Sequence, residues 1–456
     1  MIRYFGALAT LGILGLSLVS IGPAAAGQAT PNTPLVIPEL VRSASPGVGD
    51  IDGDGINDLV IASQSGVVRA YRSGNLGDLL WSVAAVPYVP AYCNAQSTPT
   101  AIESSPVVAD VDADGSNDII IGMGSTYAPN QNGGLQVLNA DGTVKWNWTG
   151  SNDLFNVWNA GTGATPDGWC EGVFASAAVG DVNGDGTPDV VFGGWDHFVH
   201  ALDGRTGAEL PGFPFDNVDT IWSSPALYDV DGDGRDEIFT GGDDSPGRPG
   251  GAAGGQIHAL DWDNGQVNVL WKRHPDETAM GSVAIGDING DGRPEMVITN
   301  GLFYNNADTR KVQAFQLDDG TDVPGWPVQL DGVVTASVAL GDVNGDAQLD
   351  VVVGDWNSNV YALDGSGSQI WKTAICCNPA SSSLNAIKAG AVIGDLDGDG
   401  DNDVAVGSGW SMQILNGQTG SRMQELGIGF SYDSSPLLAD FGSRGRRLYM
   451  AGFDLL

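Results

Sequence analysis

A nine-residue pattern of acidic side chains recurs along the chain and has the composition of a site for a hard cation. In its first copy, Asp50, Asp52 and Asp54 stand at alternate positions 1, 3 and 5, Gly55 follows at position 6, and Asp58 stands at position 9. Seven copies occur, with their first positions 48 to 71 residues apart. The candidate metal ligands at positions 1, 3, 5 and 9 are Asp50, Asp52, Asp54 and Asp58; Asp110, Asp112, Asp114 and Asp118; Asp181, Asn183, Asp185 and Asp189; Asp229, Asp231, Asp233 and Glu237; Asp287, Asn289, Asp291 and Glu295; Asp342, Asn344, Asp346 and Asp350; and Asp395, Asp397, Asp399 and Asp403.

This spacing suits calcium. Oxygen ligands at alternate positions converge when the chain wraps around an ion, and glycine at position 6 permits the sharp turn. Ca²⁺ accepts about 6–8 oxygen ligands in a flexible geometry, whereas Mg²⁺ demands a stricter octahedron. One such loop is equally well explained as a solvated acidic turn, but seven copies in register exclude chance. We therefore expect about seven bound Ca²⁺ ions.

The loops differ from EF-hands, which carry a glutamate at position 12 and lie between helices. Position 12 here is apolar or threonine, as at Ile61 and Thr240, and the flanks are short β-branched runs such as residues 118–122. Each loop is therefore expected to join two strands of a hairpin. The sixth loop has Ala347 in place of glycine at position 6, so it is expected to be the weakest site if this residue needs a positive φ.

Further signals complete a repeating unit of four strands, A to D. Strand A often begins with Ser-Ser-Pro, as at 104–106, and strand C ends in a turn such as Asp141-Gly142 or Asn416-Gly417. Strand D often carries a tryptophan, for which we expect packing between units: Trp81, Trp146, Trp271 and Trp371. Four antiparallel strands per unit, repeated along the chain, predict an all-β fold, a β-propeller of four-stranded blades with the metal loops as A–B turns.

The number of blades depends on an eighth, incomplete unit. Residues 434–452 repeat strands A and B, but Gly442 and Arg444 replace ligands 3 and 5, so no calcium is expected there. Residues 34–42 have the composition of an outer strand for this blade and would close the ring with both ends of the chain. Eight blades are the preferred architecture, and seven are the alternative.

From about Ser43 onward the chain resembles the FG-GAP/VCBS repeat family, the calcium-loop propellers typified by the head of integrin α subunits. The resemblance rests on the acidic loops. Segments such as residues 361–365 followed by Trp371 also look like repeats of quinoprotein dehydrogenases. The resemblance implies calcium-bearing blades. It does not choose a function, because related propellers bind proteins or sugars and others are rhamnogalacturonan lyases.

Residues 1–26 have the pattern of a secretory signal peptide. Arg3 is the only charge, an apolar run extends from Leu8 to Ile21, and three alanines at 24–26 offer a cleavage site. The run is too short for a membrane anchor. We expect residues 27–456 to form a single exported propeller domain that is secreted, periplasmic or at the cell surface, with no membrane span after cleavage. The four cysteines, Cys93, Cys170, Cys376 and Cys377, allow three disulfide pairings that the sequence does not distinguish.

Composition narrows the partners. Asp and Glu number 56 against 19 Lys and Arg, for a formal net charge of -37, which repels phosphate backbones and makes nucleic acid an unexpected partner. A hydrophobic fraction of 42% is enough to build a core and excludes wholesale disorder.

The long connections predict where a ligand binds. In a four-stranded blade the A–B and C–D turns lie on one face, and the B–C and D–A connections lie on the other. The long connections, such as 82–103, 149–173 and 241–255, belong to the second face, where recognition usually occurs on a rigid scaffold. They carry the aromatic residues Tyr88, Tyr92, Tyr127, Phe155, Trp158, Trp169, Phe303 and Tyr304. These side chains either bind a protein or glycan ligand or pack the loops against each other.

Catalytic signals are sparse. The four histidines lack a metal-binding spacing such as H-E-x-x-H, and no G-x-S-x-G motif occurs, so no catalytic residue is assigned. The sequence favours a calcium-stabilised, non-enzymatic module for ligand binding or adhesion. The alternatives are a polysaccharide lyase, or another carbohydrate-active enzyme that uses the loop-rich face, and a structural scaffold of a surface assembly.

Overall fold

The computed structural model describes residues 41, 43–91, 93–96, 98–124, 131–150, 169–246, 251–304, 310–375, 386–409, 411–427 and 434–451. These residues form seven four-stranded antiparallel sheets and one two-stranded sheet. In every sheet the strands pair in chain order.

The first strands of the sheets are β1 (Gly47–Gly49), β5 (Val107–Ala109), β9 (Ala178–Gly180), β13 (Ala226–Tyr228), β17 (Ala284–Gly286), β21 (Ala339–Gly341), β25 (Val392–Gly394) and β29 (Leu437–Asp440). The second strands are β2 (Asp58–Ala62), β6 (Asp118–Met123), β10 (Asp189–Gly193), β14 (Glu237–Asp244), β18 (Glu295–Asn300), β22 (Asp350–Gly354), β26 (Asp403–Ser408) and β30 (Arg446–Tyr449). The third strands are β3 (Val67–Tyr71), β7 (Gly134–Leu138), β11 (Phe198–Asp203), β15 (Gly254–Asp263), β19 (Lys311–Gln316), β23 (Asn359–Leu363) and β27 (Ser411–Asn416). The fourth strands are β4 (Leu79–Ala84), β8 (Val144–Trp148), β12 (Phe215–Asp216), β16 (Gln266–Arg273), β20 (Val328–Gln329), β24 (Gln369–Ala374) and β28 (Arg422–Gly427).

Burial follows the order of the strands within a sheet. Every residue of β2, β10 and β22 is buried, as expected for continuous β-branched runs covered on both faces. The fourth strand alternates exposed and partly buried residues, as in β4, because one of its faces meets solvent.

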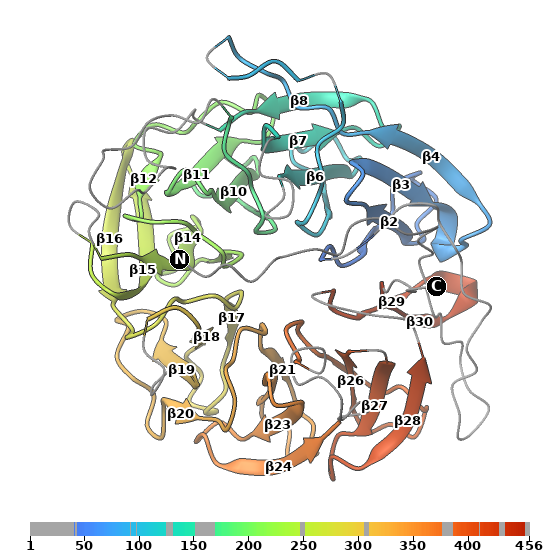
Figure 1. Ribbon diagram of the computed structural model, residues 1–456, viewed down its shortest axis with the longest axis vertical. Helices are drawn as coiled ribbons and strands as arrows, with labels where there is room; N and C mark the ends of the chain where they lie inside the picture. Colours follow the sequence, from blue (N-terminus) through green and yellow to red (C-terminus); the bar gives the residue numbers. More distant parts are fainter. Residues whose placement is uncertain are drawn as a thin grey trace, which may run out of the picture.

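The sheets follow one another around a ring, with their first strands toward the centre and their fourth strands at the rim (Figure 1). First strands of neighbouring sheets contact each other, as β1 with β5 and β21 with β25. The predicted all-β propeller is therefore confirmed. Within the described ranges, two short 3-10 helices, η1 (Arg72–Gly74) and η3 (Gly442–Arg444), interrupt the strands, and no helix there is long and apolar enough to cross a membrane.

The tryptophans of the fourth strands join neighbouring sheets, as expected. Trp146 Nε1 donates to the carbonyl of Gly204, and Trp271 Nε1 donates to that of Leu317, both at 2.8 Å and both in the next sheet. The indole of Trp271 also lies against Gly320, which has φ +66 and would place a Cβ 2.5 Å from the ring. The Trp271 ring of one sheet thus packs against a glycine turn of the next sheet.

The last sheet packs against the first. Ser435 N donates to Ser45 Oγ at 2.8 Å, and the Tyr449 hydroxyl donates to the Gly74 carbonyl at 2.7 Å. Phe441 and Tyr449 belong to the same apolar cluster as Leu59 of β2. The ring is closed by these contacts. The strand predicted over 34–42 lies outside the described residues apart from Val41, which is buried in that cluster, so the number of complete blades stays a prediction.

Candidate functional site

Each metal loop joins the first and second strands of a sheet, and the carboxylate at position 1 organises it. In the first loop, Asp50 accepts the amide hydrogens of Gly53, Asp54 and Gly55 at 2.9, 3.1 and 2.8 Å. The first aspartates of four other loops make the same three bonds: Asp181, Asp229, Asp287 and Asp342. These bonds wrap the loop tightly around its first side chain.

Five of the seven loops bring three carboxylates together. One oxygen from each lies within 4.8 Å of the others in these sets: Asp50, Asp52 and Asp58; Asp110, Asp112 and Asp118; Asp229, Asp231 and Glu237; Asp287, Asp291 and Glu295; Asp395, Asp397 and Asp399. The position-5 side chains Asp54, Asp114 and Asp233 lie outside these sets and accept the amide of position 7 at 2.8 to 2.9 Å.

The loops with asparagine at position 3 have a different internal contact. Asn183 donates to Asp189 at 3.4 Å, Asn344 donates to Asp350 at 3.3 Å, and Asn289 donates to Glu295 at 2.6 Å. In each case the amide nitrogen faces the position-9 carboxylate. A metal ion would need the amide oxygen instead, which rotation of the side-chain amide supplies.

The position-9 carboxylates begin the second strands and are buried. Burial raises the pKa of Asp189 and of Glu237 to about 7 and the pKa of Asp350 and of Asp403 to about 6, although backbone amide hydrogen bonds favour the ionised forms. A cation among these groups would favour ionisation of all of them.

The donor set fits calcium. All the side-chain ligands are oxygens, from carboxylates or amides, which suits a hard cation. In the seventh loop, Asp403 Oδ1 is buried without a hydrogen-bond partner in the described part of the chain. An acceptor of that kind has room for one more electropositive partner. The residues that would hold the ions are those at positions 1, 3, 5 and 9.

Two positions of each loop need the left-handed backbone conformation. Position 6 has φ between 69° and 96° in all seven loops. Ala347, at 69°, therefore has the positive φ on which the expected weakness of the sixth site depends. Position 4, which the sequence analysis did not single out, is also left-handed and is glycine in six loops. In the second loop it is Ala113, with φ 59°.

Basic side chains already contact three of the loops, and in the fourth loop Arg235 pairs with Asp233. Lys145, from β8, donates to Asp112 and, at 2.8 Å, to Asp118 in the second loop. Arg72 pairs with Asp52 in the first loop. Burial opposes the charge of Lys145, but hydrogen bonds to these two aspartates outweigh it and raise the pKa of the ammonium group. Sequence reasoning missed this contact because Lys145 is 33 residues from Asp112 along the chain.

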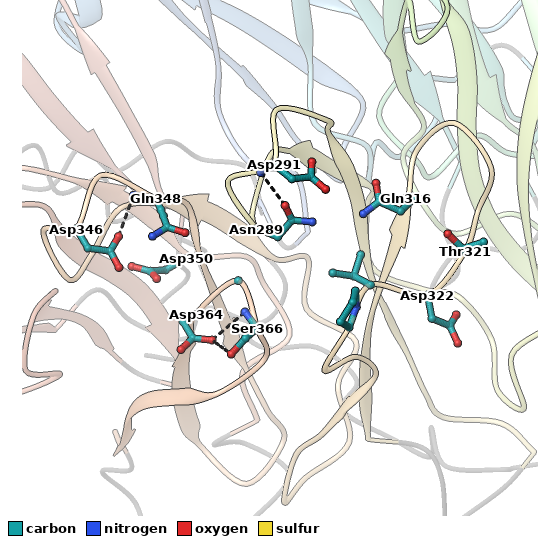
Figure 2. Close-up of a pocket in the computed structure, with 13 residues that line it drawn as sticks. Asn289, Asp291, Gln316, Thr321, Asp322, Asp346, Gln348, Asp350, Asp364 and Ser366 are labelled. Atoms are coloured by element: carbon teal, nitrogen blue, oxygen red, sulfur yellow. Dashed lines mark hydrogen bonds between the residues drawn. The ribbon is translucent and has the colours of Figure 1, made fainter.

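A cleft of about 740 Å³ opens between the fifth and sixth loops. Figure 2 shows Asn289 and Asp291 of one loop across from Asp346 and Asp350 of the other, with Asp364 and Ser366 of a turn beside them. Four of these six side chains are predicted metal ligands. The cleft therefore belongs to the metal loops, on the face for which sequence predicted a structural role.

The opposite face is partly described. Tyr88 is 65% exposed and Phe303 is 43% exposed, so both side chains are accessible from solvent. Trp169 and Tyr304 are also described. Tyr92, Tyr127, Phe155 and Trp158 lie outside the described residues.

An arc of aromatic rings on this face was not predicted. Trp195 lies edge-on to Phe174 and to Trp222, with ring centroids 4.4 and 4.9 Å apart, and the Trp222 ring lies 6.4 Å from that of Phe303. These residues come from D–A connections and B–C turns of neighbouring sheets. The four rings lie close together in space although the residues are far apart in the sequence.

The arc borders a pocket of about 220 Å³ at the centre of the ring. Its lining comes from the segments just before the first strands and includes Phe174, Trp222, Glu103, Lys388 and a set of serines. The Lys388 ammonium lies 4.8 Å from the centre of the Trp356 ring. The pocket wall is thus mainly polar, and the aromatic arc lies at its border.

Cys93 and Cys170 form a disulfide, with Cα atoms 5.7 Å apart. It links the D–A connections that follow the first and second sheets. This selects one pairing for these two cysteines from those that the sequence left open. Cys376 and Cys377 lie outside the described residues.

His200 is buried between two carboxylates. Its Nε2 lies 3.2 Å from Asp196 and its Nδ1 lies 3.1 Å from Glu209, with the Phe192 ring stacked at 5.1 Å. Burial disfavours the imidazolium, but Asp196 and Glu209 outweigh burial and raise the pKa of His200 to about 9. The group is a buried ion cluster with 4% exposure of the His200 side chain.

Comparison with known proteins agrees with this geometry. A family model described as an FG-GAP-like repeat matches residues 50–121, 181–240, 229–298 and 342–406, which together exceed half of the chain. Similar solved structures include BamB from Moraxella catarrhalis, with a TM-score of 0.55 and 16% identity over 92% of this chain and 96% of that chain. A europium-containing methanol dehydrogenase has a TM-score of 0.57 and 13% identity, and the match covers 95% of this chain and 84% of that chain. A quinohemoprotein alcohol dehydrogenase from Comamonas testosteroni has a TM-score of 0.54 and 14% identity, and the match covers 96% of this chain and 76% of that chain. At these identities the likeness concerns the fold alone.

Proposed function

Because the chain belongs to the FG-GAP-like repeat family, we propose that it is an exported propeller that calcium stabilises and that binds a protein or glycan ligand without catalysis. About seven Ca²⁺ ions bind the A–B loops, and the ligand binds the face formed by the B–C and D–A connections. The observation that carries this proposal is that the two faces of the propeller carry different kinds of residue. Clustered carboxylates occupy one, and an aromatic arc around a central pocket occupies the other.

The proposed calcium role is structural. Each ion would neutralise carboxylates held within a few ångströms of each other and would tie the end of a first strand to the start of a second. Binding to the folded chain alone stabilises it by mass action. The chemistry supplied by the ion is charge neutralisation and cross-linking of the two strands.

The proposed ligand role rests on exposed aromatic side chains and on the pocket. Tyr88 and Phe303 offer apolar area to a partner, and the pocket walls offer hydroxyl groups. Aromatic and polar groups in a concave site are typical of recognition. The signal-peptide pattern of residues 1–26 supports a secreted, periplasmic or cell-surface location.

Two measurements on the full mature chain in calcium test this function. Equilibrium dialysis is expected to find about seven ions per chain, and a glycan array together with a pull-down of surface proteins is expected to find a ligand. An ultraviolet absorbance assay on pectins is expected to show no unsaturated product. Release of such a product would establish the lyase alternative, and fewer than three ions would refute the assignment of the loops.

A further inference from the structure

Three of the seven metal loops carry an asparagine followed by a glycine at positions 3 and 4. These pairs are Asn183-Gly184, Asn289-Gly290 and Asn344-Gly345, and the other four loops have aspartate at position 3. Asparagine before glycine deamidates readily, because glycine has no side chain to hinder attack by its backbone nitrogen. Position 3 of these loops thus combines a metal-ligand role with a side chain that can gain a negative charge by spontaneous chemistry.

The reaction needs no reagent other than water. The backbone nitrogen of the glycine attacks the side-chain carbon Cγ of the asparagine, and the proton of that nitrogen passes to the Nδ2 group. Ammonia leaves as the Cγ–Nδ2 bond breaks, and a cyclic imide remains. Addition of water to one imide carbonyl gives aspartate. Addition to the other gives isoaspartate, in which the main chain runs through Cγ.

Water reaches the reacting groups in the three loops. Gly184, Gly290 and Gly345 are exposed, and the asparagine before each of them is half-buried. Two other Asn-Gly pairs lie in the interior, because Asn132 is fully buried and Asn300 is 1% exposed. The structure therefore separates pairs that the sequence alone makes equivalent.

Hydrogen bonds restrain each pair in the closed loop. The amide of Gly184 donates to Asp181 Oδ1 at 2.8 Å, and the equivalent bonds from Gly290 and Gly345 measure 2.8 and 2.7 Å. The asparagine Oδ1 atoms accept the amide hydrogen of position 5 at 2.8 to 2.9 Å. Attack requires the glycine nitrogen to give up its hydrogen bond and the asparagine side chain to turn, so deamidation requires local opening of the loop.

The charge of the loops connects this opening to calcium. With an ion bound, the position-1 carboxylate and the position-3 amide oxygen are both ligands, so opening must first release the ion. Binding to the closed loop alone lowers the population of open forms by mass action. Without the ion, the carboxylates at positions 1, 5 and 9 repel each other, which favours opening.

The two products have opposite effects on a site. Aspartate at position 3 is the residue of the other four loops, and a ligand set with more negative charge binds calcium more tightly. In the sixth loop the bond from Asn344 Nδ2 to Asp350 at 3.3 Å would be lost at the same time, so the metal-free loop becomes less stable. Isoaspartate adds a methylene group to the main chain between positions 3 and 4, which breaks the spacing of the ligands.

We propose that Asn183, Asn289 and Asn344 are deamidation sites that bound calcium protects, and that their aspartate product binds calcium more tightly than the asparagine does. A loop left without its ion is therefore converted irreversibly. The inference goes beyond ligand binding by the opposite face, and it rests on the proposed calcium role of the loops.

Peptide mapping by mass spectrometry tests the protection on the mature chain, held for weeks in calcium or in EGTA below its melting transition in both. The three loop asparagines are expected to gain the mass of an amide-to-acid exchange at least about tenfold faster in EGTA. Asn264, exposed in the hairpin turn between β15 and β16, is the control that should convert equally in both media. Asn300 should stay an amide in both, which verifies that the chain stays folded.

The outcomes separate this inference from the calcium role itself. Equal conversion of the loop asparagines in the two media, or none in EGTA, would overturn the inference even if equilibrium dialysis finds the ions. Conversion of Asn300 together with the loops would overturn it too, because unfolding of the whole chain would then be the cause. Failure of the calcium role is read from the dialysis alone, as fewer than three ions.

Asn344→Asp tests the effect of the aspartate product in the sixth loop. A calorimetric titration should show a calcium affinity about tenfold higher at that loop, and melting in EGTA should show a lower Tm. Asn264→Asp adds the same charge outside the loops and should leave the titration unchanged. Weaker calcium binding by Asn344→Asp, with Asn264→Asp unchanged, would overturn the assigned effect of the product.

Discussion

At the scale of single residues, two alanines in the metal loops hold a conformation that suits glycine. Ala113 has φ 59° and Ala347 has φ 69°. At position 6 of the other six loops, an added Cβ would meet nothing within 4 Å, so space is not the constraint. The cost at Ala347 is conformational, about 1–2 kcal/mol for a left-handed residue other than glycine.

Ala347→Gly is expected to raise the free energy of unfolding in calcium by about 1 kcal/mol and to tighten the weakest class of calcium sites. The reason is that glycine removes the strain that favours a relaxed, metal-free loop. Chemical denaturation and a calorimetric calcium titration measure the two effects. Ala113→Gly is the matched variant at position 4 of the second loop. No gain from either change would show that these loops store no strain.

Lys145 is expected to compete with calcium in the second loop. Lys145→Gln removes an ammonium group that contacts Asp112 and Asp118, so the metal-free protein should lose stability. The same change should raise calcium affinity at that loop by about tenfold, because no fixed cation has to leave. Competition is shown if Lys145→Gln lowers the melting temperature in chelator and raises the calcium affinity in the titration. A variant that binds calcium more weakly would mean that Lys145 supports the site.

His200 gives stability that depends on pH. Its pKa is raised to about 9 in the folded protein, above the ordinary 6.5, so the folded state holds the proton more tightly than the unfolded state. This contribution is complete below about pH 6.5 and is lost as the pH rises through about 9. Denaturant unfolding at pH 7 and pH 9.5 should therefore show a larger loss for the wild type than for His200→Gln. Equal losses would refute a charged His200.

At the scale of elements, hydrogen bonds from asparagine side chains of the metal loops join neighbouring sheets. Asn117, at position 8 of the second loop, donates to the Asp50 carbonyl at 2.7 Å, and Asn402 of the seventh loop donates to the Asp342 carbonyl at 2.8 Å. Asn57 of the first loop does the same to Asp440 of the last sheet. A change in the conformation of one loop is therefore expected to affect the loop of the neighbouring sheet.

The closure of the ring depends on the small last sheet. Phe441 is fully buried, and its ring lies edge-on to Tyr449 at 5.3 Å in the apolar cluster shared with the first sheet. Phe441→Ala should cost about 3–5 kcal/mol of unfolding free energy, as in an ordinary core, although its own sheet has two strands in the described residues. Denaturant unfolding, with Phe441→Leu as the milder control, measures this. A cost below about 1 kcal/mol would show that the last sheet does not hold the ring.

The sequence predicted the strands and loops better than the contacts between residues that are far apart along the chain. The acidic loops, the β-branched second strands and the packing tryptophans follow local patterns, and the structure has them where expected. The Ser-Ser-Pro motif marked strand starts, but sequence did not show that Ser45 and Ser435, 390 residues apart, share a hydrogen bond. The aromatic arc, the Lys145 contact and the Cys93–Cys170 pairing likewise depend on the ring geometry and on no local signal.

At the scale of the whole molecule, charge sets the demand for metal. The formal net charge is -37, and seven calcium ions would supply about +14, five of the ions at loops that bring three carboxylates together. Without ions, these carboxylates repel each other, and burial of the position-9 groups disfavours their ionisation. Because the loops contact each other around the ring, loss of the ions is expected to weaken the whole fold and not only single loops.

The most direct test is thermal melting of the mature protein in calcium and in EGTA, with magnesium added to a third sample. Each site contributes roughly 1–3 kcal/mol when calcium exceeds its Kd by about 10–100-fold. The account predicts that EGTA lowers Tm by at least about 10 °C, that restored calcium reverses the loss, and that magnesium does not replace it. An identical melting curve in calcium and in EGTA would contradict the proposal that these loops are calcium sites that hold the propeller together.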